Sequence, residues 1–81
     1  MNLKSLGANK TEIKVPGGLT LLISYATPVA CIWTNGKEST SYATEKKWSA
    51  TTTRHIKQWL GGPAMHLKPQ SYFDHLLSEV K

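Results

Sequence analysis

Two turn signals divide the first half of the chain into short segments that favour β-strands. Pro16-Gly17-Gly18 follows the alternating polar and apolar stretch from Thr11 to Val15, and proline with glycine ends regular structure. Asn35-Gly36 is a stronger hairpin signal, because both residues tolerate the positive φ of a type I′ turn. The segments beside these turns are rich in β-branched residues, Leu and Tyr, which favour strands. They span residues 11–15, 19–25, 29–33 and 39–45, and the last of them could extend as far as Trp48. The sequence therefore predicts a meander of three or four antiparallel strands.

The second half of the chain has a helical pattern instead. Ser49 to Thr53 offers several hydroxyl groups for a helix N-cap. An apolar face then recurs at helical spacing, formed by Ile56, Trp59 and Leu60. Gly61-Gly62-Pro63 ends this helix, and Pro69 suits the first turn of a second one. The apolar face of the second helix consists of Phe73, Leu76, Leu77 and Val80. The predicted fold class is α+β: a small antiparallel sheet of three to four strands, followed by two short C-terminal helices packed on it.

Size and composition limit how this fold is organised. The 81 residues make one domain, 1–81, with a core that supplies only a few kcal/mol of net stability, so burial against a second copy in a homodimer stays open. The hydrophobic fraction of 40% is too high for a disordered tail. Cys31, the one cysteine, lies in an apolar run, which predicts a buried and reduced thiol. With no apolar stretch long enough for a signal peptide or a membrane span, we expect a cytoplasmic protein with no membrane partner.

The positive charge of the chain is concentrated in one window. The formal net charge is +5, and residues 46–68 contain five basic side chains and no acidic one. These basic residues are Lys46, Lys47, Arg54, Lys57 and Lys68. The remaining five lysines are matched by five acidic residues, so the rest of the chain is neutral in sum. Such an asymmetry favours an anionic partner.

The beginning of the first predicted helix is the candidate binding site. Spacing of i, i+3 and i+4 puts Arg54, Lys57 and Gln58 on one side of that helix. Hydroxyls and free backbone N–H groups at Thr52 and Thr53 would mark a helix N-terminus, which favours phosphate. Lysines from the preceding strand add phosphate contacts, and an exposed Trp48 would stack on an unpaired base. The predicted nucleic-acid-binding set is Lys46, Lys47, Trp48, Thr52, Thr53, Arg54, Lys57 and Gln58. The alternative is a solvated helix face with ordinary caps, in which Trp48 and Trp59 belong to the core.

Metal, cofactor and enzyme chemistry are not indicated. The three histidines, His55, His66 and His75, share no metal-ligand spacing, so no metal site and no cofactor is expected. His55 lies near the helix start, where we expect it to bond a backbone carbonyl or water. The sequence has no Gly-rich phosphate loop and no nucleophile elbow. It therefore predicts a protein without catalytic activity.

Three stretches together resemble a known group of proteins. They are Ile23–Ala30 (ISYATPVA), Thr44–Leu60 (TEKKWSATTTRHIKQWL) and Lys68–Phe73 (KPQSYF). They are similar to a family of small proteins of uncharacterised function, found mostly in tailed-phage genomes. The resemblance implies a viral origin and an accessory, non-structural role inside a bacterial host cell. It carries over no catalytic or binding residues.

Two classes of function remain from these observations. The first is a module that binds nucleic acid or a host nucleoprotein complex through the basic window. The second is an inhibitor of a host enzyme or of an anti-phage defence complex, similar in kind to an anti-CRISPR protein, which acts through an exposed sheet edge or the second helix. The basic charge argues against DNA mimicry, which needs an acidic surface. A self-associating structural module is a plainer third possibility.

Overall fold

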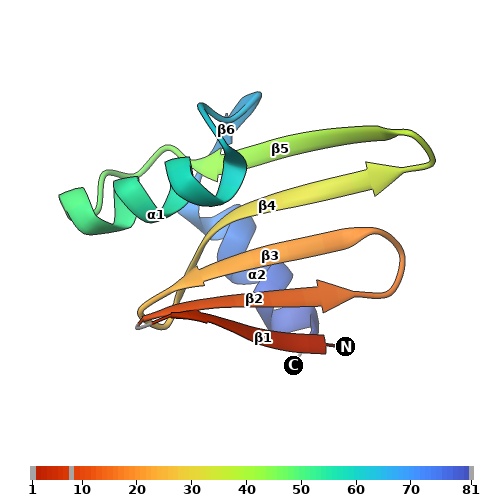
Figure 1. Ribbon diagram of the computed structural model, residues 1–81, viewed down its shortest axis with the longest axis horizontal. Coiled ribbons are helices and arrows are strands. Elements are labelled where there is room, and N and C mark those ends of the chain that lie inside the picture. Colours follow the sequence, from red (N-terminus) through yellow and green to blue (C-terminus); the bar gives the residue numbers. More distant parts are fainter. Residues whose placement is uncertain (1, 8, 81) are drawn as a thin grey trace.

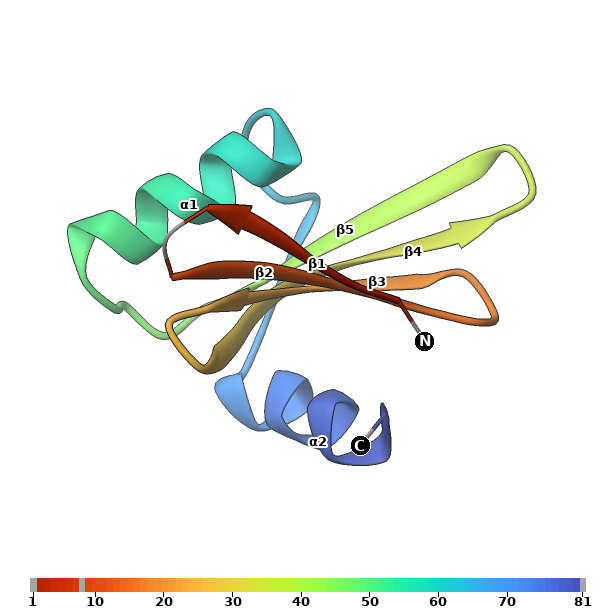
Figure 2. The ribbon, with the colours of Figure 1, turned by 60° about the horizontal axis from the view of Figure 1, so that its bottom comes forward.

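The computed structural model describes the chain except for residues 1, 8 and 81, and it shows one sheet with a helix on each face (Figures 1 and 2). Within the described residues the strands are β1 (Asn2–Gly7), β2 (Lys10–Val15), β3 (Leu19–Ser24), β4 (Thr27–Asn35), β5 (Glu38–Thr44) and β6 (His66–Lys68). The helices are α1 (Ala50–Leu60) and α2 (Gln70–Val80). The predicted α+β class with two C-terminal helices is confirmed. The predicted strand number is wrong, because the described sheet has six strands rather than three or four.

Both strands that the sequence did not reveal lie at the edges of the sheet. The spatial order is β1-β2-β3-β4-β5-β6, antiparallel from β1 to β5, with β6 parallel to β5 (Figure 1). The segment of β1, NLKSLG, has no β-branched or aromatic residue, so it lacks the usual composition of a strand. The three residues of β6 are too few to show a period. α1 forms the crossover that a parallel pair such as β5 and β6 requires.

The two predicted hairpins form, but one turn differs in detail. Gly17 and Gly18 connect β2 to β3 with φ angles of 103° and 96°. In the second hairpin Asn35 pairs with Glu38, so the two-residue loop is Gly36-Lys37, and only Gly36 has a positive φ there, of 64°. The predicted type I′ turn centred on Asn35-Gly36 is therefore wrong by one residue. A glycine of positive φ at the first central position is typical of a type II′ turn, which suits the strand twist equally well.

The sheet is buried on both faces, with a separate apolar cluster under each helix. The α2 side contains Ile13, Leu19, Leu21, Cys31, Phe73 and Leu76. The α1 side contains Leu22, Val29, Ala30 and Ala43, with Ile56 and Trp59 of α1 packed against them. A β-bulge interrupts the pairing of β3 with β4: Leu22 pairs with Ala30, but Ile23 pairs with Pro28. The extra residue, Val29, therefore lies with its neighbour Ala30 in the α1-side cluster.

Cys31 is fully buried, as predicted, and burial raises the pKa of its thiol to about 12. The thiol is therefore protonated at neutral pH and packs as a small apolar side chain.

α1 and α2 have 11 residues each, and neither has the length and hydrophobicity to cross a bilayer.

Candidate nucleic-acid interface

The beginning of α1 is closed by its own N-cap. Ser49 has an extended backbone, and its Oγ accepts a hydrogen bond of 3.2 Å from the backbone N–H of Thr52. The N–H of Thr53 donates to the carbonyl of Ser49 at 3.1 Å. The prediction of free N–H groups at Thr52 and Thr53 is therefore wrong, because the Ser49 cap already satisfies both. These two N–H groups are therefore not available to a phosphate group.

A buried polar cluster ties the first turns of α1 to β3. The Oγ of Ser24 lies 3.2 Å from the Oγ1 of Thr52 and 3.0 Å from the Nδ1 of His55. Ser24, Thr52 and His55 are exposed by only 2%, 5% and 8%. The side chain of Thr52 is thus hidden from a large ligand and serves to position the helix.

His55 differs from its expected role, because its Nδ1 is paired with a buried hydroxyl rather than with a backbone carbonyl or water. Burial lowers the pKa of His55, and the positive charges of Lys10 and Arg54 lower it further. The imidazole is therefore neutral at physiological pH. It fixes α1 on the sheet and adds no charge to the basic surface.

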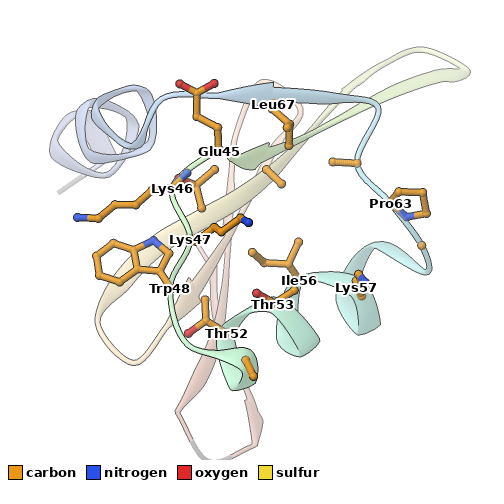
Figure 3. A pocket seen from close by; sticks show the side chains of 15 residues that line it. Glu45, Lys46, Lys47, Trp48, Thr52, Thr53, Ile56, Lys57, Pro63 and Leu67 are labelled. Carbon is orange, nitrogen blue, oxygen red and sulfur yellow. The ribbon is translucent and has the colours of Figure 1, made fainter.

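A cavity of about 390 Å³ lies between α1 and the adjoining ends of β5 and β6 (Figure 3). Its apolar wall is formed by Ala43, Ala50, Ile56, Pro63, Ala64 and Leu67. Leu67 is 62% exposed although it belongs to a strand, because β6 is the last strand on its side of the described sheet. The volume lies within the range typical of small-molecule sites.

Lysines from two different elements surround this cavity. Lys46 and Lys47 come from the connection between β5 and α1, and Lys57 comes from the last turn of α1. In Figure 3, Lys46 lies at the Trp48 end of the cavity with its side chain directed outward, Lys57 lies at the other end, and Lys47 lies between them. All three lysines are exposed, and Glu45 is the one acidic residue among the described lining residues. The rim therefore carries a net positive charge, as the sequence predicted for this segment.

Trp48 lies at the cavity rim and is 38% exposed, so it is not a core residue as the alternative reading supposed. Its indole Nε1 donates to the Oε1 of Gln70 at 3.1 Å, which holds the ring in place. The Nζ of Lys46 lies 4.3 Å from the ring centroid and covers one face by a cation–π contact. A stacking ligand would use the free face or displace Lys46. Trp59, in contrast, packs against the α1-side cluster, and its Nε1 donates to Glu12.

The structure divides the eight predicted site residues into two groups. Those that line the cavity are Lys46, Lys47, Trp48, Thr52, Thr53 and Lys57. Arg54 and Gln58 are exposed on α1 but do not line it. Lys68, part of the basic window, lies on the α2 side, with its Nζ over the rings of Tyr42 and Tyr72.

The sequence interpretation missed the far wall of the cavity. Pro63, Ala64 and Leu67 follow α1 and line the cavity opposite the lysines of the β5–α1 connection. They carry no charge and no periodic pattern, so nothing in the sequence associates them with a site. Only the return of the chain to pair with β5 brings them there.

Comparison with known proteins supplies a family but no function. A family model described as a family of unknown function (DUF8033) matches residues 1–75. No curated protein and no solved structure shows significant similarity to the chain. The match includes all of β1 to β6, both walls of the cavity and the first half of α2. The chain therefore belongs to this family of unknown function, DUF8033.

Proposed function

We propose that this protein is a non-enzymatic module that binds nucleic acid, with the sugar–phosphate backbone held at the lysine rim of the cavity. The observation that carries the proposal is the position of Lys46, Lys47 and Lys57, which come from two elements and lie along one cavity. Lysine side chains are common ligands of backbone phosphates, and their attraction to a polyanion needs no sequence-specific contact. Arg54 is exposed one turn before Lys57 on α1 and would extend the same basic surface.

The resemblance to small tailed-phage proteins supports this proposal from another direction. Accessory proteins of that kind commonly bind nucleic acid or host complexes. A viral protein that works inside a bacterial host would meet nucleic acid at high concentration. The net charge of +5 favours such an encounter.

The test is fluorescence anisotropy with labelled single-stranded and duplex oligonucleotides at low salt. Lys47→Glu and Lys57→Glu should each weaken binding by about ten-fold. Lys68→Glu changes the net charge equally but acts on the α2 side, so it should leave the affinity nearly unchanged. Absence of binding at low salt, or equal losses for all three variants, would contradict the proposal.

A second candidate function is an inhibitor that binds a host enzyme or an anti-phage defence complex. The observation that favours it is β1, which ends the described sheet and carries Leu3 with 69% exposure. An unpaired strand edge can accept a strand from another protein. Pull-down from nuclease-treated bacterial lysate distinguishes the two candidates: a stoichiometric protein partner that is lost on Leu3→Lys supports the inhibitor, and no such partner argues against it.

A further inference from the structure

We infer that the cavity receives one unstacked nucleobase, so that the preferred ligand is single-stranded nucleic acid rather than duplex. This inference rests on the proposed function and specifies its substrate class. The lysine rim alone would bind any polyanion. Among nucleic-acid ligands, the apolar cavity beneath the rim adds a requirement that an unpaired base meets and a paired base does not.

The size and the lining of the cavity suit a flat aromatic ring. An apolar protein cavity of about 150 Å³ holds benzene, so the 390 Å³ here is large enough for a bigger ring system. Ile56 and Leu67 provide apolar surface on two sides, one from α1 and one from β6 (Figure 3). A base in a duplex is stacked and paired, so it cannot enter a side cavity without leaving the helix. A base in a single strand enters at far lower cost.

The arrangement of the cations fits a strand that crosses the cavity. Lys46 lies at one end and Lys57 at the other, with Lys47 between them (Figure 3). A small amphipathic anion has a single charged head, for which cations at one end would be enough. A nucleotide chain carries a phosphate on each side of every base, so cations at both ends match its charge distribution. Charge complementarity thus favours an oligonucleotide as the occupant.

The hydroxyl groups of the lining favour a base that is held without strong sequence preference. The Thr44 hydroxyl accepts from the N–H of Lys46, and the Thr53 hydroxyl donates to the carbonyl of Ser49. The Thr52 hydroxyl is occupied by Ser24 and Ser49. These bonds leave each hydroxyl fewer free positions with which to read a base edge. Contact with the ring face is tolerant of all four bases.

The test uses two matched variants, Leu67→Trp and Met65→Trp. Both parent residues are 62% exposed and only two positions apart, but Leu67 lines the cavity and Met65 does not. Affinity is measured by anisotropy for a single-stranded oligonucleotide of about 12 nucleotides, its duplex and its abasic counterpart. The wild type should bind the single strand about ten-fold more tightly than either of the other two probes. Leu67→Trp should remove most of that preference, and Met65→Trp should keep it.

A second readout does not depend on either variant. Methyl NMR of the wild-type protein should show ring-current shifts at Ile56 and Leu67 with the normal oligonucleotide and not with the abasic one. Equal affinity for single strand, duplex and abasic probe would overturn the inference while leaving the proposed phosphate binding intact. The inference would also be overturned, with phosphate binding left intact, if Leu67→Trp leaves the affinity unchanged although Lys47→Glu weakens it. Absence of binding to every probe would instead overturn the proposed function itself. A competition experiment with an acidic peptide that contains one aromatic residue tests the other occupant. If the peptide displaces the oligonucleotide from the wild type, and the oligonucleotide alone causes no methyl shifts, the cavity would be assigned to a protein partner.

Discussion

At the scale of single residues, two adjacent glycines have different structural roles. Gly17 and Gly18 both have a positive φ, of 103° and 96°. A Cβ atom at Gly18 would lie 2.2 Å from the carbonyl oxygen of Thr34, whereas a Cβ at Gly17 would meet nothing within 4 Å. The carbonyl of Gly18 also accepts the N–H of Thr34 at 2.7 Å, so the β2–β3 turn is held closely against β4.

This difference predicts unequal effects of two alanine substitutions. Gly17→Ala should cost about 1–2 kcal/mol of unfolding free energy, because the positive φ is unfavourable for alanine. Gly18→Ala should cost at least about 2 kcal/mol more, since the backbone of β4 must also move. Urea denaturation of both variants measures the difference. Equal losses would show that the steric contact with Thr34 is relieved without cost.

The buried histidine predicts a pH dependence of stability. The pKa of His55 is lowered in the folded state, so the unfolded chain binds a proton more readily. Stability from this residue is therefore complete above about pH 6.5 and is lost as the pH falls below that value. His55→Gln should reduce the decline of the melting temperature between about pH 7 and pH 5. His75→Gln alters an exposed histidine and serves as the control; an equal effect of both variants would contradict the assignment to His55.

Sequence reasoning at this scale succeeded for some residues and failed for others. Cys31 was predicted to be buried and is, because its apolar neighbours determine its environment. His55 and Thr52 were misread, because their partner Ser24 lies 28 or more positions earlier in the chain. A polar contact between distant segments leaves no local pattern in the sequence.

At the scale of elements, the beginning of α1 is held by the N-cap that Ser49 provides. Ser49→Ala removes the acceptor for the N–H of Thr52 and should cost about 1 kcal/mol of unfolding free energy. Ser71→Ala replaces an exposed serine in the first turn of α2 and should be close to neutral. Thermal unfolding followed by circular dichroism compares the two. A neutral Ser49→Ala would mean that the contact of Thr52 with Ser24 is enough to hold the helix start.

The elements also show where sequence patterns are informative. Strands β2 to β5 and both helices were predicted because each has a clear period or a strong turn at its ends. β1 and β6 were missed, since pairing with a neighbour rather than their own composition makes them strands. The residues that line the cavity follow the same rule: the lysines are conspicuous in the sequence by their charge, and Leu67 of β6 is not.

At the scale of the whole molecule, the basic window is split between two faces of the sheet. Lys46, Lys47 and Lys57 surround the cavity on the α1 side, and Lys68 contacts Tyr42 and Tyr72 on the α2 side. The sequence predicted the charge asymmetry but not this division. The division depends on the return of the chain through β6, which no charge pattern reveals.

The split predicts the salt dependence of nucleic-acid binding. If three lysines contact phosphates of a single strand, the logarithm of the binding constant should fall against the logarithm of the salt concentration with a slope of about −2. Lys47→Ala should make the slope less steep by about 0.7, and Lys68→Ala should leave it unchanged. Titrations at several salt concentrations give these slopes. A slope close to zero would show that phosphate contacts contribute little.

The parallel pairing of β5 with β6 affects the order in which the cavity is built during synthesis. Hairpins between neighbouring strands can form as soon as both strands have left the ribosome. The wall at Leu67 needs the complete α1 crossover first, because Ala43 pairs with Leu67 across the intervening helix. A nascent chain therefore exposes Lys46, Lys47 and Lys57 before Leu67 completes the apolar wall. If the cavity receives an unstacked base, full selectivity for that base would be acquired only when β6 emerges. A chain interrupted before His66 would still be basic but would not yet discriminate.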